Sequence, residues 1–167
     1  MVKVAYAGSG RVSLAGIVAL KPSERPRLIY RTITCHGRKG QKKGFAEHDY
    51  ARLLDDAHQQ LHAPVVLVWD NLNTHKSALM RELIAARDWL TVFYLPSYAP
   101  EYNPVEGVWA HMKTSLANLA KRTLDQLATL IKSRLRRIQH RTALLDGLIA
   151  KTGLDLQTPE TPAIQPL

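Results

Sequence analysis

Residues 65–75 of the chain have the sequence VVLVWDNLNTH. The first five form a continuous apolar run, which is typical of a strand buried on both faces of a sheet. The run ends at Asp70, and ligands of open α/β sheets bind beyond the carboxyl ends of the strands. A carboxylate placed there needs a cation or a hydrogen-bond donor, although Asp at such a position also commonly caps the next turn. Asn71 and His75 follow, and we expect both to support Asp70.

The hydrophobic periodicity on either side of this run predicts the other elements. Strands are expected over residues 2–7, 12–20, 28–34, 65–69 and 90–95, and helices over residues 45–61, 77–86, 105–119 and 124–138. In the second helix we expect Leu79, Leu83 and Ile84 to point inward. This order of elements predicts an α/β fold in which helices flank one mixed sheet. The proline-rich end predicts a disordered tail over residues 151–167, after a domain over residues 1–150.

Composition restricts the class of protein further. The chain has 167 residues, a formal net charge of +9 and a single cysteine. One cysteine excludes a disulfide framework within the chain and a cysteine-based metal cluster. The apolar runs are too short to span a membrane, and no secretory signal pattern follows Met1. We therefore expect a soluble cytoplasmic protein that does not bind membranes.

The charges are unevenly distributed along the chain. Residues 1–43 carry a net charge of +9, residues 44–112 carry −5, and residues 113–141 carry +7. Two basic arms can attract a polyanion, and nucleic acid is the usual one, although a generally basic solvated surface would look the same. The candidate phosphate contacts are Arg38, Lys39, Lys42 and Lys43 in a glycine-containing loop, Lys113, and Arg134, Arg137 and Arg141, which recur on one helix face.

A second stretch, residues 95–109, has the sequence LPSYAPEYNPVEGVW. We expect its prolines and packed aromatic rings to stiffen a loop that delivers Glu106 to the first turn of a helix, where an acid also favours the helix dipole. Two adjacent parallel strands would bring Asp70 close to the start of this loop. Asp70 and Glu106 could then share a hard cation, and oxygen ligands favour Mg²⁺ or Mn²⁺.

These two stretches together resemble the catalytic domain of DDE transposases, specifically bacterial insertion-sequence members of the mariner superfamily. The resemblance covers roughly residues 9–120, and 35 residues separate Asp70 from Glu106. It implies a ribonuclease-H-like fold, two divalent ions, and DNA strand cleavage followed by strand transfer. Asp70 would be the second catalytic acid and Glu106 the third. The implied partners are transposon-end and target DNA, with the protein acting at the bacterial nucleoid.

One departure from this family limits the expected activity. The family's first catalytic Asp lies on the first strand of the sheet, and here the only acids before Asp49 are Glu24 and Glu47. We therefore expect a C-terminal part of a transposase that lacks the first strand and is weak or inactive alone. It is either a remnant or a part completed by an upstream segment or by another copy in a homo-oligomer. The alternatives are a non-catalytic DNA-binding or oligomerising fragment, and an unrelated hydrolase of small phosphates.

Overall fold

Five strands and five helices make up the described part of the chain. The structure is a computed structural model that describes residues 2–5, 10–116 and 123–154. Its strands are β1 (Val2–Ala5), β2 (Arg11–Ala19), β3 (Arg27–Cys35), β4 (Val65–Trp69) and β5 (Leu90–Tyr94). Its helices are α1 (Glu47–Leu61), α2 (Ala78–Ala85), α3 (Pro104–Leu116), α4 (Leu124–Gln139) and α5 (Thr142–Ala150).

The strands form two sheets. Strands β1, β2 and β3 are an antiparallel meander, and β4 pairs with β5 in parallel. We predicted one mixed sheet, and this was wrong: no ladder joins the two sheets within the described ranges. The α/β class itself is confirmed, because α1 connects the two sheets and α2 connects the parallel strands.

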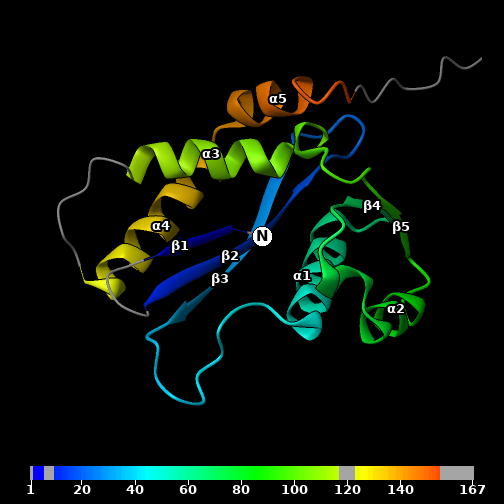
Figure 1. Cartoon of the computed structure of the whole chain (residues 1–167). Coiled ribbons are helices and arrows are strands. Elements are labelled where there is room, and N and C mark those ends of the chain that lie inside the picture. The colour runs from blue at the N-terminus through cyan, green and yellow to red at the C-terminus, as the bar shows by residue number, and fades with distance from the viewer. Residues whose placement is uncertain (1, 6–9, 117–122, 155–167) are drawn as a thin grey trace, which may run out of the picture.

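Helices cover both faces of the β1–β3 sheet, as Figure 1 shows. Alternate residues of the meander point to opposite faces, so that Leu14 packs with α3, α4 and α5 while Ala15 packs with α1. Each face therefore has its own hydrophobic core. The core that includes Ala15 continues through α1 to β4, β5 and α2. The end of β4 is thus held by the same apolar cluster that anchors α1 to the meander.

A close approach fixes α3 against β2. The ring of Trp109 lies so near Gly16 that a Cβ atom there would come within 3.0 Å of the ring atom Cη2. Trp109 itself is only 1% exposed. A side chain at position 16 would therefore require the Trp109 ring to shift by a few tenths of an ångström. The lack of a side chain at Gly16 allows α3 to pack this closely against β2.

The parallel sheet is covered on only one face. Val66 and Val68 of β4 are 66% and 54% exposed, and Phe93 of β5 is 57% exposed. Our prediction that residues 65–69 form a strand buried on both faces was therefore wrong. Leu67 and Trp69 point to α1 and α2, and the opposite face is open among the described residues. A continuous apolar run does not show how many faces of the strand are covered.

The helices agree with the predicted periodicity, with two differences. In α2, Leu79 is 40% exposed, whereas Met80 is fully buried, so the inward position of Leu79 was wrongly predicted. Sequence reasoning did not identify α5, which follows α4 after a break of two residues. Residues 117–119 of the third predicted helix and residues 155–167 of the predicted tail lie outside the described part of the chain. No described helix has both the length and the apolar character needed to cross a membrane.

The start of α4 offers a test of its cap. Thr123 Oγ1 accepts a hydrogen bond from the Gln126 N–H at 3.2 Å, and Gln126 Oε1 accepts one from the Thr123 N–H at 3.0 Å. Replacing Thr123 by Ala leaves the Gln126 N–H without its side-chain partner and should lower the free energy of unfolding by about 1 kcal/mol. Urea denaturation measures this change. Thr114→Ala, at an exposed position in the last turn of α3, is the control, and an equal decrease there would contradict the capping role.

Candidate metal and nucleic-acid site

The polar site begins where β4 ends. The Leu95 N–H donates to the Trp69 carbonyl at 2.9 Å, so the chain leaving β5 runs beside the chain leaving β4. The side-chain amide of Asn71 also donates to the Leu95 carbonyl. These hydrogen bonds confirm that the parallel pair brings Asp70 next to the start of the loop that leads to Glu106. Asn71 thus connects the segment after β4 with the segment after β5 through a hydrogen bond.

Asp70 is held by two donors on one of its oxygens. Its Oδ1 lies 2.8 Å from His75 Nδ1 and 3.3 Å from the Leu72 backbone nitrogen. A carboxylate cannot donate a proton, so the His75 proton of this pair is on Nδ1. The hydrogen bond from His75 lowers the pKa of Asp70 below its usual value, against the opposing effect of burial. The Asp70 side chain is still 40% exposed, and its Oδ2 has no hydrogen bond to a described residue.

Aromatic packing holds His75 in place. Its ring stacks on Trp69 with centroids 4.0 Å apart and an interplanar angle of 2°. The ring of Tyr50 meets the His75 ring edge-on at 4.6 Å, and the hydroxyl of Tyr94 donates to the His75 carbonyl at 3.0 Å. His75 is only 5% exposed. These contacts fix the His75 ring beside Asp70, and its supporting role in a functional site stays a prediction.

Sequence reasoning missed Tyr50 as a part of this site. Burial raises the pKa of its hydroxyl well above the usual value, and the negative charge of Asp70 raises it further. The Tyr50 hydroxyl and His75 Nε2 are both buried without a described hydrogen-bond partner. The helical periodicity of the sequence places Tyr50 on the apolar face of α1. Its contact with the His75 ring is visible only in the structure.

Glu106 lies in the first turn of α3. The Asn103 side chain accepts a hydrogen bond from the Val105 N–H at 3.1 Å, and the Asn103 carbonyl accepts one from the Glu106 N–H at 3.0 Å. This start of the helix places Glu106 partly exposed, with no ion pair or side-chain hydrogen bond to a described residue. Glu101, in the preceding 3₁₀ turn Pro100–Tyr102, is exposed.

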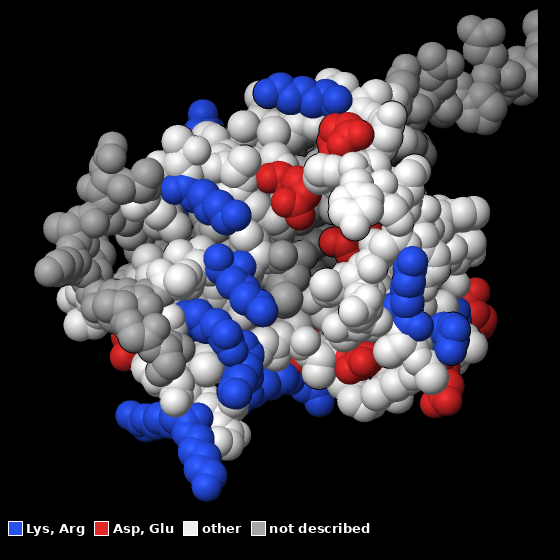
Figure 2. Space-filling view, viewed as in Figure 1, with Lys and Arg blue, Asp and Glu red and all other residues white. Residues whose placement is uncertain are grey.

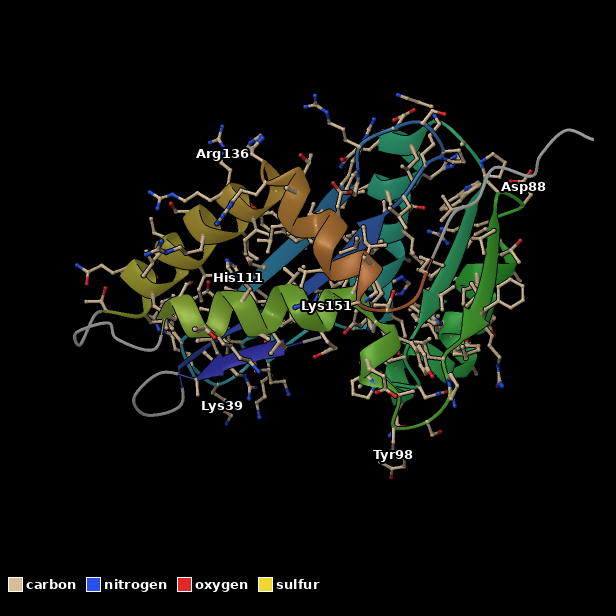
Figure 3. The ribbon with its side chains drawn as sticks, turned by 90° about the horizontal axis from the view of Figure 1, so that it is seen from above. Lys39, Asp88, Tyr98, His111, Arg136 and Lys151 are labelled. Carbon is tan, nitrogen blue, oxygen red and sulfur yellow. The ribbon has the colours of Figure 1, made fainter. Side chains whose placement is uncertain are left out.

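Aromatic packing does not hold the loop before α3, contrary to our prediction. Tyr98 is fully exposed and Tyr102 is 54% exposed, and Figure 3 shows Tyr98 pointing away from the body of the protein. The backbone of Tyr98 has φ of 60°, in the left-handed region that side chains other than glycine seldom adopt. The stiffness of this loop therefore comes from its three prolines, its 3₁₀ turn and the hydrogen bonds of Leu95 at its start.

The described residues contain no group of three His, Cys, Asp or Glu side chains that could hold a metal ion. Asp70 has the properties of one ligand of a hard cation. Its pKa is lowered, its side chain is partly exposed, and its Oδ2 has no hydrogen bond to a described residue. No hydrogen bond or ion pair joins Asp70 to Glu106 within the described ranges. The pairing of these two acids on one ion stays a prediction.

The basic residues are divided between two surfaces. Figure 2 shows Lys and Arg side chains gathered over the β1–β3 sheet and the connection below it, with acidic side chains mainly towards the start of α3 and the β4–β5 side. In the connection, Arg38, Lys39 and Lys43 are exposed, and Lys42 pairs with Asp49 at 2.5 Å. On the helices, Lys113, Arg137 and Arg141 are exposed and Arg134 is half-buried.

The pairing of His75 with Asp70 predicts a pKa change. His75→Phe keeps the aromatic stack on Trp69 and removes the Nδ1 donor, so the pKa of Asp70 should rise towards the ordinary value. Since the pKa is lowered in the folded protein, Asp70 stabilises the fold above the pKa of an unfolded Asp, and this contribution disappears as pH falls through the folded-state pKa. The variant should therefore be less stable at neutral pH, and its free energy of unfolding should fall less as the pH is lowered.

Carboxyl-carbon NMR of Asp70 across an acid titration measures this pKa directly. His58→Phe is the matched control, because His58 stacks on Trp89 with centroids 4.1 Å apart at 5° and makes no hydrogen bond or ion pair with Asp70. An Asp70 titration that is the same in both variants would show that His75 does not tune this carboxylate.

Comparisons with known proteins identify a family for most of the chain. The family model described as "DDE superfamily endonuclease" matches residues 8–131. No curated protein sequence matches the chain. The solved catalytic domain of Mos1 mariner transposase is 13% identical, with a TM-score of 0.49, over 87% of this chain and 83% of that one.

Two further solved structures of Mos1 transposase are similar. The paired-end complex with left transposon end is 14% identical with a TM-score of 0.49, and the Strand Transfer Complex is 13% identical with a TM-score of 0.48. Each match covers 87% of this chain, and 56% and 55% of the respective Mos1 chains. This chain therefore spans just over half the length of those Mos1 chains. Because the family model matches well over half of its residues, the chain belongs to the DDE superfamily of endonucleases.

Proposed function

We propose that this chain is the catalytic-domain part of a DNA transposase of ribonuclease-H-like fold, in which Asp70 and Glu106 bind divalent metal. The observation that carries the proposal is the placement of Asp70. It is a half-exposed, ionised carboxylate at the end of a parallel strand, beside the chain that leads to Glu106. The family model supports the proposal because the residues that it matches include both Asp70 and Glu106.

For this reaction the protein has to hold the metal ions and the DNA in position and to supply charge. A bound Mg²⁺ or Mn²⁺ supplies positive charge beside the attacking and leaving oxygens of a phosphodiester. Asp70 offers its free Oδ2 to such an ion, while His75 and the Leu72 N–H fix the orientation of the carboxylate. Glu106 offers a second carboxylate from α3. The exposed basic side chains at residues 38–43 and on α4 would bind the DNA backbone.

The site as described holds two of the three acids that this family uses, so we propose that the chain is inactive or weak by itself. Among the described residues, β2 lacks a partner for residues 15–19 on the side of β1, and β4 is paired only with β5. A further strand that carries the first acid could pair with one of these free strand edges. An upstream segment or another copy of the chain would supply it.

DNA affinity with and without Mn²⁺ tests this function. We expect Mn²⁺ to strengthen binding of labelled duplex DNA to the native chain, and we expect no such increase in the Asp70→Asn/Glu106→Gln double variant. Equal affinity in EDTA and in Mn²⁺ for the native chain would refute the metal-dependent function. That result would favour the alternative, a DNA-binding or oligomerising fragment that modulates a complete transposase.

A further inference from the structure

A basic cavity of about 640 Å³ lies between α3 and the second half of α4. It is lined by His111 and Ser115 of α3, by residues Ser133, Arg134, Arg136, Arg137 and Ile138 of α4, and by His140 and Arg141 just after it. No acidic side chain is among them. In Figure 3 His111 lies between the two helices, and Arg136 points outward from α4.

The arginines of this cavity have no carboxylate partner among the described residues. Asp125, the one acid of α4, is at the opposite end of the helix and lies 3.5 Å from His36. Arg134 is half-buried, and its Nε is fully buried without a hydrogen-bond partner. A buried guanidinium N–H without an acceptor is unfavourable, and because Arg134 lines the cavity, an anion there would offset the charge of its guanidinium group.

The chemistry of the lining indicates which anion fits. Guanidinium groups match the geometry of phosphate oxygens with two parallel hydrogen bonds, and serine hydroxyls and imidazole rings add further donors. Arg134 and Arg137 lie on one flank of α4, because a step of three residues returns to nearly the same side of a helix, and Arg141 lines the same cavity just beyond the helix end. Such a row suits successive phosphates better than a single small ion.

The cavity is separate from the Asp70 and Glu106 site. His111 follows Glu106 by five residues, which is about 140° around α3 and about 7.5 Å along it. Ser115 follows by nine residues, about 180° around the helix and about 13.5 Å along it. The cavity therefore opens on a different side of α3 from Glu106. Phosphates held there are not those at the metal site.

We propose that this cavity is a second nucleic-acid site, which holds backbone phosphates of DNA remote from the position of strand cleavage. The proposal rests on the proposed function for its choice of DNA as the source of phosphate. It assigns direct phosphate binding to Arg134, Arg137 and Arg141, with His111 and Ser115 of α3 as further donors in the same cavity. Free polyphosphate would offer the same chemistry, and the experiment must separate the two sources.

Binding of fluorescein-labelled duplex DNA in EDTA, followed by anisotropy over a range of salt, tests the cavity without the metal site. The variant is Arg137→Gln/Arg141→Gln, and the charge-matched control is Arg52→Gln/Arg81→Gln, whose exposed arginines lie on α1 and α2. We expect the cavity variant to bind about tenfold more weakly. The slope of log affinity against log salt should fall by about 0.9 for each DNA phosphate that the variant no longer neutralises.

The control should change affinity by less than about twofold and leave the slope unchanged. Equally weakened binding in both variants would overturn the proposal, because it would reflect net charge alone. Inorganic tripolyphosphate should compete with DNA for the native chain. Binding of tripolyphosphate to the cavity in a chain that binds no DNA would overturn the choice of nucleic acid.

Repeating the titrations of the native chain in Mn²⁺ distinguishes this proposal from the proposed function, because the cavity residues do not include Asp70 or Glu106. If the cavity arginines prove irrelevant while Mn²⁺ still strengthens DNA binding, the cavity proposal fails and the proposed function stands. If the cavity variant binds weakly while Mn²⁺ has no effect on the native chain, the cavity site stands and the metal-dependent function fails.

Discussion

Asp70→Asn should weaken Mn²⁺ binding by about a hundredfold or more. Removal of a residue that merely supports a metal ligand costs about 10- to 100-fold in affinity, and Asp70 is proposed as the ligand itself. An amide in its place keeps the shape of the side chain and the possibility of a hydrogen bond with His75, but it removes the negative charge. The fold should therefore persist while the ion no longer binds. Isothermal titration with Mn²⁺ measures the effect.

The matched control for this titration is Asp88→Asn. Asp88 lies just before β5, at the opposite end of the parallel sheet from Asp70, and Figure 3 shows it near the start of that strand. Glu106→Gln adds a second comparison: if both acids share one ion, its effect should resemble that of Asp70→Asn. Unchanged Mn²⁺ affinity in both Asp70→Asn and Glu106→Gln would remove the site assignment.

Trp109→Ala should lower the free energy of unfolding by about 3–5 kcal/mol. The side chain is 1% exposed and joins α3 to β2 across Gly16, which has no side chain to fill the space. A domain of this size is stable by only about 5–15 kcal/mol, so the decrease is a large part of the total. Urea denaturation followed by circular dichroism gives the free energy and shows whether the transition stays cooperative.

Trp89→Ala is the comparison for this variant. Trp89 is only partly buried and stacks on His58, so its removal should cost clearly less. Equal decreases at the two positions would contradict the view that Trp109 anchors α3. If Trp109→Ala does not fold, Trp109→Phe keeps part of the ring and should give an intermediate decrease.

Local sequence signals identified the elements well because each depends on near neighbours. The apolar run from Val12 to Leu20, the alternation after Arg27 and the helical stripe from Leu124 to Ile138 predicted β2, β3 and α4 to within about two residues. The same signals could not show how the elements are covered. The apolar run of β4 looks the same whether one face or both faces are buried, and only the packing of α1 and α2 leaves Val66 and Val68 exposed.

In the site, too, some features could be predicted from the sequence and others depend on packing. The position of Asp70 after a strand and its closeness to Leu95 followed from strand order, because parallel neighbours end at the same edge of a sheet. Tyr50 could not be found in this way, since its pairing with His75 joins residues 25 positions apart through the packing of α1. The full exposure of Tyr98 could not be predicted either, because it depends on a left-handed backbone conformation within the loop.

The close packing of Gly16 and Trp109 has a consequence for genetics. A residue in the second strand of the meander sets where α3 lies, and α3 carries Glu106. Under the proposed function, in which another segment supplies the first acid, a search for loss-of-function alleles of the assembled transposase would recover substitutions at position 16 alongside those of Asp70 and Glu106. Such alleles would be recognised by suppression: a smaller ring at position 109 should restore them, whereas no change at that position could restore a missing carboxylate.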